Sequence, residues 1–260
     1  KTAEPKVPHN DPWAYARVPN SNRVRTTGKT RPRNHMPETE AYLFYRGLGD
    51  FDIPIRVTSN LADEITIKNG LQQSLTQLFV IQVDGGQGSF RKLPQLNSKG
   101  LQKVSLAKLS PPQPIAEMVK KLKLELAISL QGEGLTLDEA NAMTNTWEKS
   151  YFHTEGLRLL YVLPRPFVEQ ILPLAFEPKP LDLVRVLVGR IECISAKVEQ
   201  EVLQALLSLE DENTNKQKVA RQRLQRLGRF LEPHLRRALQ LSMEPTVKAR
   251  AKALLADLSS

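Results

Sequence analysis

The sequence predicts an α+β protein built from an N-terminal extended arm, an antiparallel β-sandwich, a mixed α/β region and C-terminal helices. Between residues 38 and 110, short apolar runs recur at roughly ten-residue spacing with turn residues between them, which is typical of a sandwich. At Pro111 the apolar spacing changes to that of helices, and from Ser195 onward it stays helical. The chain is therefore divided into an extended basic arm (1–37), a β-sandwich domain (38–110), a mixed α/β region (111–214) and a basic helical pair (215–260).

The composition indicates a substantial core. The chain has 260 residues, of which 40% are hydrophobic and 6% aromatic, so Leu, Val and Ile must fill most of the interior. No run of about 18 uncharged apolar residues occurs, so the sequence predicts no transmembrane segment. The single cysteine, Cys193, excludes an internal disulfide and a multi-cysteine metal site. The chain begins at Lys1 rather than at Met, which we interpret as processing or truncation; a removed signal peptide would explain it.

The net charge of +9 is unevenly distributed. Residues 1–37 carry 8 Lys/Arg against 2 Asp/Glu, and residues 215–260 carry 11 against 3, so both ends are strongly basic. Residues 111–214 carry 10 against 16, so the middle is acidic. Basic ends can dock onto an anionic surface such as a membrane face or a nucleic acid. The alternative is that they lie against the acidic middle or are simply solvated.

Residues 1–37 are interpreted as an arm because six prolines disfavour regular structure there. Trp13 and Tyr15 are isolated aromatics in this polar stretch. Such side chains usually anchor an extended segment in a groove, either on its own domain or on a partner. We expect Trp13 and Tyr15 to be partner-binding residues. The spaced arginines of the arm could equally follow a nucleic acid backbone.

The strands of the sandwich are predicted from period-2 alternation and turn residues. The expected strands cover residues 41–45, 51–57, 64–68, 78–83 and 88–93. Pro54 places the second of these at an edge or beside a bulge, and Asn69-Gly70 is a strong turn signal. Gly47 and Gly49 are interpreted as two bends rather than a phosphate cradle, because no helix follows them.

The mixed region begins with a helix over residues 115–130, whose inner face carries Met118, Leu122, Leu126 and Leu130. Thr136 and Glu139 form a capping box for a second helix. One stripe of that helix carries Ala140, Met143, Trp147 and Tyr151. Residues 157–163 then predict a buried strand, residues 167–172 a short helix, and residues 181–194 another strand.

From Ser195 the pattern predicts helices. The first has Val202, Leu206 and Leu209 facing inward, and residues 211–215 form a polar loop. An Arg-rich helix follows over residues 218–227. Pro233 opens a helix over residues 235–241, and Pro245 begins a final helix that reaches Leu258. The last two look like one HEAT-like helical pair, which cannot form a solenoid alone and is expected to pack on the domain or on a partner.

Three segments carry a resemblance to a known group of proteins. They are Ser150-Tyr-Phe-His-Thr-Glu-Gly-Leu-Arg-Leu-Leu-Tyr-Val-Leu-Pro-Arg165, Arg185-Val-Leu-Val-Gly-Arg190, and the HEAT-like tail. With the Phe-Tyr-Arg-Gly segment at 44–47, the chain resembles a group of uncharacterised, exported bacterial proteins over residues 40–258. The resemblance implies the architecture and an extracytoplasmic location, periplasmic or membrane-peripheral. It implies no activity and no catalytic residues.

Catalytic and metal-binding signals are sparse. The four histidines, His9, His35, His153 and His234, form no known metalloprotease motif, and no nucleophile elbow or phosphate-binding loop occurs. His153 and Glu155 could act as a base with its orienting carboxylate, or as two metal ligands, but a third ligand is missing nearby. Cys193 is interpreted as a buried small hydrophobe. We predict no catalytic residue, no metal site and no cofactor.

Three functions remain as alternatives. The favoured hypothesis is a non-catalytic structural or interaction protein, an accessory subunit that docks onto a larger, membrane-associated or soluble assembly through its arm and basic helical end. The second is a nucleic-acid-binding protein that uses the C-terminal arginines, and the third is a hydrolytic enzyme centred on His153 and Glu155. The expected partner-binding residues are Trp13, Tyr15, Arg221, Arg226, Arg229, Arg236 and Arg237, and Arg223 also belongs to the nucleic-acid hypothesis.

Overall fold

The structure is a computed structural model that describes residues 13–18, 21, 23–25, 39–41, 50–177 and 179–258. It divides into two compact units. The first comprises residues 1–53, 114–154 and 163–187, and the second comprises residues 54–113, 155–162 and 188–260. The α+β class is confirmed, because antiparallel sheets of three and five strands precede a group of C-terminal helices. The predicted strand over residues 41–45 and the bends at Gly47 and Gly49 lie outside the described residues.

The first unit is mainly helical. It contains α1 (Ile115–Gly132), α2 (Leu137–Trp147) and α3 (Arg165–Ile171), with the short 3-10 turn η1 (Ala14–Ala16) and the two-stranded pair β1 (Val24–Arg25) and β2 (Thr39–Glu40). The predicted inner face of α1 is confirmed as buried. The capping box is confirmed too: the Glu139 N–H donates to the Thr136 hydroxyl, and the Thr136 N–H donates to the Glu139 carboxylate at 2.8 Å.

The prediction that one α-helix continues through Tyr151 was wrong in its last turn. Helix α2 ends at Trp147, and residues Glu148–Phe152 form a π-helical turn, η3. The wider turn still brings Trp147 and Tyr151 together, with ring centroids 4.9 Å apart and planes 14° apart. Both rings are half-buried, and Phe152 is fully buried. A π-turn adds one residue to the helical repeat, which is why Phe152 points inward immediately after Tyr151.

The second unit contains both larger sheets. One has the order β3 (Ile55–Ser59), β4 (Glu64–Asn69), β7 (Leu101–Ser105), and the other has the order β10 (Val188–Cys193), β9 (Gly156–Val162), β5 (Leu78–Asp84), β6 (Gln87–Leu93), β8 (Gln113–Pro114). The 3-10 turn η2 (Leu106–Lys108) follows β7. Strand β9 pairs on one side with β5 and on the other with β10, so it lies in the sheet interior. This position explains its almost uninterrupted burial from Leu157 to Val162.

Two strand predictions need correction. The strand expected over residues 51–57 begins only at Ile55, because Pro54 has no N–H to donate to a ladder; its carbonyl instead accepts from the Gly70 N–H at 2.7 Å. The strand expected over residues 181–194 is β10, which covers Val188–Cys193 alone. Its partner strand β9 ends at Val162, opposite Val188, so the residues before Val188 have no strand to pair with.

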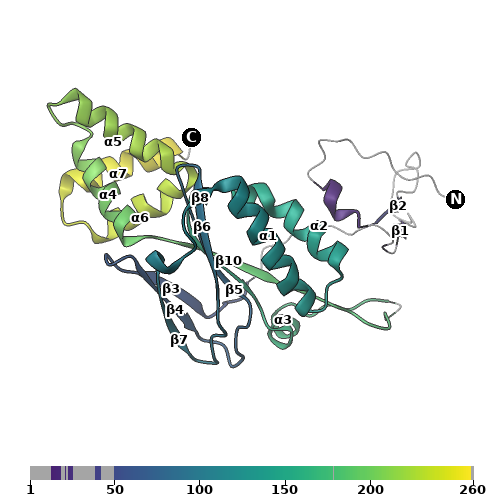
Figure 1. The fold of residues 1–260 in the computed structure, drawn as a ribbon. Coiled ribbons are helices and arrows are strands. Elements are labelled where there is room, and N and C mark those ends of the chain that lie inside the picture. The colour runs from purple at the N-terminus through teal and green to yellow at the C-terminus, as the bar shows by residue number, and fades with distance from the viewer. Residues whose placement is uncertain are drawn as a thin grey trace, which may run out of the picture. The chain divides into compact units, whose positions relative to one another are not determined.

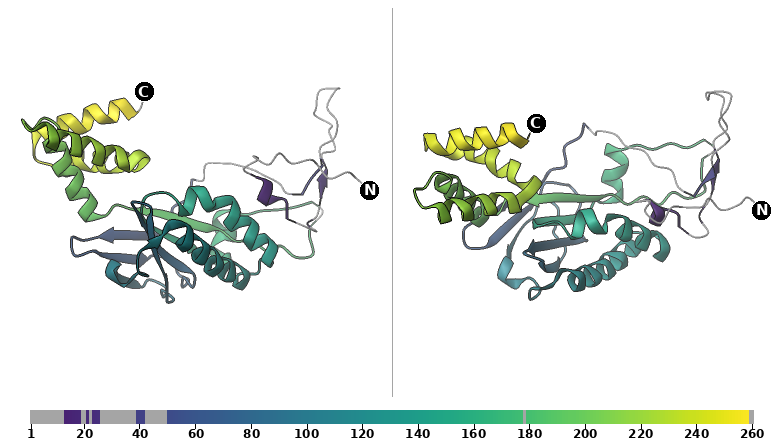
Figure 2. Two further views of the ribbon diagram at one scale, coloured as in Figure 1. Left: turned by 45° about the horizontal axis from the view of Figure 1, so that its top comes forward. Right: turned by 90° about the horizontal axis from the view of Figure 1, so that it is seen from above.

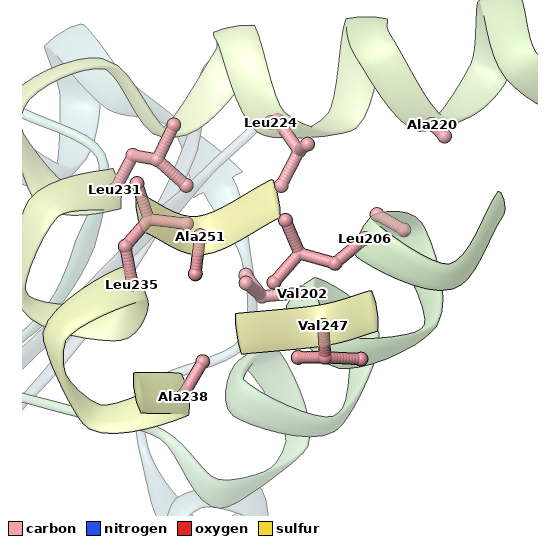
Figure 3. Close-up of a cluster of buried hydrophobic side chains, with 10 residues drawn as sticks. Val202, Leu206, Ala220, Leu224, Leu231, Leu235, Ala238, Val247 and Ala251 are labelled. Atoms are coloured by element: carbon pink, nitrogen blue, oxygen red, sulfur yellow. The ribbon is translucent and has the colours of Figure 1, made fainter. Parts of the chain in front are cut away.

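The C-terminal helices are α4 (Ala196–Ser208), α5 (Thr214–Leu227), α6 (Leu231–Leu241) and α7 (Pro245–Leu258), with the 3-10 turn η4 (Gly228–Phe230) before α6. They lie together in the views of Figures 1 and 2. Their shared core includes Val202 and Leu206 of α4, Leu224 of α5, Leu235 of α6 and Val247 of α7 (Figure 3). The HEAT-like helices α6 and α7 therefore pack with two earlier helices rather than standing as an isolated pair.

Helices α5 and α6 both begin earlier than predicted. The Asn213 side chain accepts hydrogen bonds from Asn215 and Lys216 N–H groups, so it caps α5 inside what was expected to be a polar loop. Helix α6 begins at Leu231 rather than after Pro233. Proline is tolerated there because the N–H groups of the first turn have no partner within the helix.

Candidate functional site

A cavity of about 450 Å³ lies within the second unit. Its sheet side is formed by the end of β5, the start of β9 and the end of β10. Its helix side is formed by the first turns of α4 and α6 and by the last turns of α5. Strand ends and helix ends carry polar backbone and side-chain groups, so charged and apolar side chains both line the cavity.

Arg158 is the buried charge beneath this cavity. Its side chain is completely inaccessible to solvent, although it belongs to the apolar strand β9. The guanidinium lies 3.4 Å from the Glu192 carboxylate, donates to the Glu155 carbonyl at 2.7 Å, and lies 5.9 Å from the centre of the Phe230 ring. All three of these partners line the cavity. A desolvated arginine stays charged and requires such compensation, so Arg158 fixes its neighbours in position.

Arg158 was not predicted as a functional residue. Residues 157–163 were predicted as one buried strand, and the charged residue within that strand was given no role. The available signal was the arginine itself, because a charged residue in an interior strand must meet a carboxylate or another acceptor. The identity of that carboxylate could not be predicted, since Glu192 lies in a different strand and reaches Arg158 only through the β9–β10 pairing.

Three ion pairs join residues that line the cavity. Arg223 pairs with Glu201, Arg226 pairs with Asp84, and Lys197 lies 3.9 Å from Asp63. Gly85 permits the Arg226 contact: its φ is +60°, and a Cβ there would lie 2.9 Å from Arg226 Nη2. Each lining arginine or lysine thus already has a carboxylate partner.

Glu155 is the exception among the lining carboxylates. Its two oxygens accept from the Gly85 N–H at 3.1 and 3.2 Å, and no ion pair to a cation forms among the described residues. Glu192, by contrast, faces both Arg158 and Arg190. Glu155 is half-buried at the start of β9, so its charge is turned toward the cavity lining rather than fully solvated.

His234 contributes an imidazole to the α6 side of the cavity. The residue is 6% exposed, and its Nδ1 atom is buried without a hydrogen-bond partner in the described part of the chain. Burial, together with the positive charges of Arg237 and Arg223, lowers the pKa of His234 to about 4. The ring is therefore neutral at physiological pH.

Cys193 lines the cavity from the end of β10, where the residue as a whole is half-buried. Burial raises the pKa of its thiol to about 12, and the Glu192 carboxylate acts in the same direction. A thiol that stays protonated is a weak nucleophile, so Cys193 contributes bulk and polarisability to the lining.

The structure gives His153 and Glu155 different partners. His153 Nε2 lies 3.5 Å from a Glu148 oxygen, and the other Glu148 oxygen contacts Lys123. The hydrogen bond from Lys123 is the main reason that the pKa of Glu148 is lowered. The Glu155 carboxylate contacts Gly85 instead. Among the described residues, no group of three histidine, cysteine or acidic side chains could hold a metal ion.

The expected partner-binding residues are divided between the two units: the aromatics lie in the first and the arginines in the second. Trp13 precedes η1 and Tyr15 belongs to it; η1 contacts α2, and the two residues are 37% and 57% exposed. Arg226 pairs with Asp84, Arg236 with Glu232, and Arg237 with Glu199 at 2.7 Å. Arg221 is exposed and donates to Gln217 at 3.4 Å. The side chain of Arg229 lies outside the described residues.

Comparison with other proteins gives no family for this chain. It matches no protein-family model, and no curated protein or solved structure is significantly similar to it. No helix in the described ranges combines the length and the apolar character that crossing a membrane requires.

Proposed function

We propose that this protein is a non-catalytic interaction protein, an accessory subunit that docks onto a larger protein assembly. The observation that carries the proposal is the docking segment, which we define as residues 172–187 between α3 and β10. It contains no helix or strand in its described part, from which only Pro178 is missing. Four of its large apolar side chains are exposed: Leu174, Phe176, Leu181 and Val184.

The base of the docking segment is held in place. Arg185 Nη2 donates to the Leu172 carbonyl at 2.6 Å, which closes the segment near its two ends. The Leu163 N–H donates to the Leu187 carbonyl at 2.9 Å. Val184 contacts Gly134, where a Cβ would lie only 3.1 Å from its methyl group. A long loop with an anchored base and no regular structure is typical of binding loops.

The exposed apolar side chains favour a protein partner. Leu181 is fully exposed, so burying it against a partner would contribute about 1.5–3 kcal/mol. Phe176 is the type of rigid aromatic that often dominates a binding interface. Isolated exposed leucines are common on protein surfaces, but this concentration in one anchored segment is typical of an interaction site.

The C-terminal arginines support the nucleic-acid alternative less well. Arg223, Arg226, Arg236 and Arg237 each contact a carboxylate, so phosphate groups would have to compete with these pairs. The exposed Trp13 and Tyr15 lie in the same compact unit as the docking segment and add aromatic surface for a protein partner. An extracytoplasmic location, as the resemblance implies, remains part of the proposal and is tested by cell fractionation.

Quantitative co-purification tests the proposal. The tagged full chain is isolated from its native source and compared with the triple variant Leu174→Ser, Phe176→Ser, Leu181→Ser. We expect the triple variant to lose specific partners by at least about tenfold, as removal of central apolar contacts would predict. The matched control is Leu61→Ser, which alters an exposed leucine in the β3–β4 turn. Equal recovery of the same partners by all three proteins would contradict the proposal.

A further inference from the structure

In the cavity of the second unit, every lining cation is in an ion pair, but one lining carboxylate is not. Its lining cations are all paired: Arg223 with Glu201, Arg226 with Asp84, and Lys197 with Asp63. Its carboxylates are paired as well, apart from Glu155, which among the described residues accepts from the Gly85 N–H and forms no ion pair. This pattern concerns the cavity alone and is independent of the docking segment.

The pattern determines which charge a ligand can carry at low energetic cost. An anion could bind an arginine or Lys197 only by displacing the carboxylate already in contact with it. A cation can contact Glu155 without breaking any existing ion pair. A hydrogen bond between charged groups contributes about 1.5–3 kcal/mol, more than twice a typical neutral one, so the unpaired carboxylate dominates the preference.

The remainder of the lining is apolar enough to hold a hydrocarbon body. It includes Val83, Leu106, Leu157, Ile194, Leu227 and Phe230. The guanidinium of Arg158 already lies 5.9 Å from the centre of the Phe230 ring, so this ring offers apolar surface to the body of a ligand rather than a second cation contact. The volume of about 450 Å³ lies within the usual range for small-molecule sites.

We propose that the cavity binds an organic cation: an ammonium or guanidinium group on an apolar chain or ring. The cationic group contacts the Glu155 carboxylate, and the apolar body lies against Leu157 and Phe230. The neutral imidazole of His234 adds no opposing charge to the α6 side of the cavity. The same chemistry is offered by a free amine and by a basic side chain of a peptide.

Isothermal titration calorimetry of the full chain with 4-phenylbutylamine tests the proposal. Its comparators are 4-phenylbutanol and 4-phenylbutyrate, which keep the apolar body and change the charge to neutral or negative. We expect saturable binding of the amine, weaker binding of the alcohol and no binding of the carboxylate. Glu155→Gln should weaken amine binding on the order of tenfold. Glu117→Gln, an exposed carboxylate of α1 in the first unit, is the matched control and should change nothing.

A second measurement keeps the proposal testable if Glu155→Gln unfolds. In the wild-type chain, the amine should shift the NMR amide signals of Gly85 and residues 155–157 before any others. A tripeptide, acetyl-Phe-Lys-Phe-amide, distinguishes the sources: tighter binding than the amine supports a protein side chain, and weaker binding supports a free amine. Absence of saturable binding by both probes, equal affinity of the Glu155→Gln variant, or preference for 4-phenylbutyrate would overturn the proposal.

Discussion

The ring of Tyr161 lies directly over Gly189, its cross-strand neighbour in the β9–β10 pair. A Cβ at Gly189 would lie 2.2 Å from Tyr161 Cζ and 2.5 Å from its hydroxyl oxygen. Tyr161 is 3% exposed, and burial raises the pKa of its phenol to about 12, with Arg56 opposing the shift. Glycine in this strand therefore provides space for a buried aromatic, and its lower strand propensity is offset by the ring that covers it.

Gly189→Ala should destabilise the second unit by about 1–3 kcal/mol, because the added methyl group forces the Tyr161 ring out of its position. Chemical denaturation followed by circular dichroism measures the loss. Gly132→Ala is the matched control, since no atom lies within 4 Å of the corresponding Cβ position. In a Tyr161→Ala background the effect of Gly189→Ala should largely disappear. If Gly189→Ala lowered stability equally in the wild-type and the Tyr161→Ala chains, the ring would not be the cause.

His234→Leu should make the free energy of unfolding less dependent on pH between pH 6.5 and 4. The folded pKa of about 4 lies below the ordinary value of 6.5, so above pH 6.5 the imidazole is neutral in both states and contributes no pH dependence. As the pH falls from 6.5 to 4, the unfolded chain binds the proton more readily, and the folded state loses up to about 3 kcal/mol. Below pH 4 this loss is complete.

The groups facing His234 do not reverse this sign. Arg223 and Arg237 remain cationic throughout the range, and their partners Glu201 and Glu199 already bind them. Denaturation at pH 7, 6, 5 and 4 gives the two profiles, and their difference isolates the histidine from carboxylate titration. Leu235→Val, a buried neighbour that does not titrate, should lower stability equally at every pH. Parallel profiles for wild type and His234→Leu would refute the assignment.

Asn69→Asp should lower the free energy of unfolding far more than its small change in shape suggests. The buried Asn69 amide donates to the carbonyls of Gln73 at 2.9 Å and Asn97 at 3.0 Å, while its oxygen accepts from the Leu71 N–H. A carboxylate would face two carbonyl oxygens with no proton to donate, which costs about 1–3 kcal/mol or more. Because a protonated carboxyl can donate again, the deficit should shrink as the pH falls from 7 to 5.

The control for Asn69 is Asn213→Asp. Asn213 uses only its side-chain oxygen, as the N-cap of α5, and an aspartate caps equally well and suits the helix dipole. Its effect on the urea midpoint should be close to zero or slightly stabilising. If both aspartate variants were equally destabilised, the cause would be added charge rather than loss of the Asn69 donor.

Local patterns predicted many elements of this fold. The apolar stripe of α1, the capping box of Thr136 and Glu139, and the start of α7 at Pro245 each depend on residues close in the sequence. Pairing between distant segments was not predictable in this way. Nothing local in residues 157–163 indicates that β9 lies between β5 and β10, which joins segments that the sequence suggested were separate regions.

The cavity was beyond local prediction for the same reason. Glu155 and Cys193 were singled out from the sequence, but for a catalytic pair with His153 and for packing. Their shared position depends on the β9–β10 register, and the contacts of Arg226 and His234 depend on how the C-terminal helices close over the strand ends. Ion pairs between residues far apart in the sequence produce no periodic pattern from which they could be predicted.

The last prediction concerns the Arg158–Glu192 ion pair, whose two members should respond unequally to substitution. Glu192 contacts both Arg158 and Arg190. Arg158→Met removes the fully buried cation and leaves Glu192 with Arg190, so the remaining carboxylate is still compensated. Glu192→Gln instead leaves the desolvated guanidinium of Arg158 without the carboxylate at 3.4 Å.

Glu192→Gln should therefore cost about 3–5 kcal/mol, and Arg158→Met should cost less, although methionine is the larger chemical change. Urea denaturation at pH 7 measures both, and the double variant should be closer to Arg158→Met than to the sum of the two. Arg165→Met is the control, since its exposed pair with Glu169 lies in α3 and contributes little. A larger loss for Arg158→Met than for Glu192→Gln would mean that the guanidinium acts chiefly through the Glu155 carbonyl and the Phe230 ring, and not through its carboxylate.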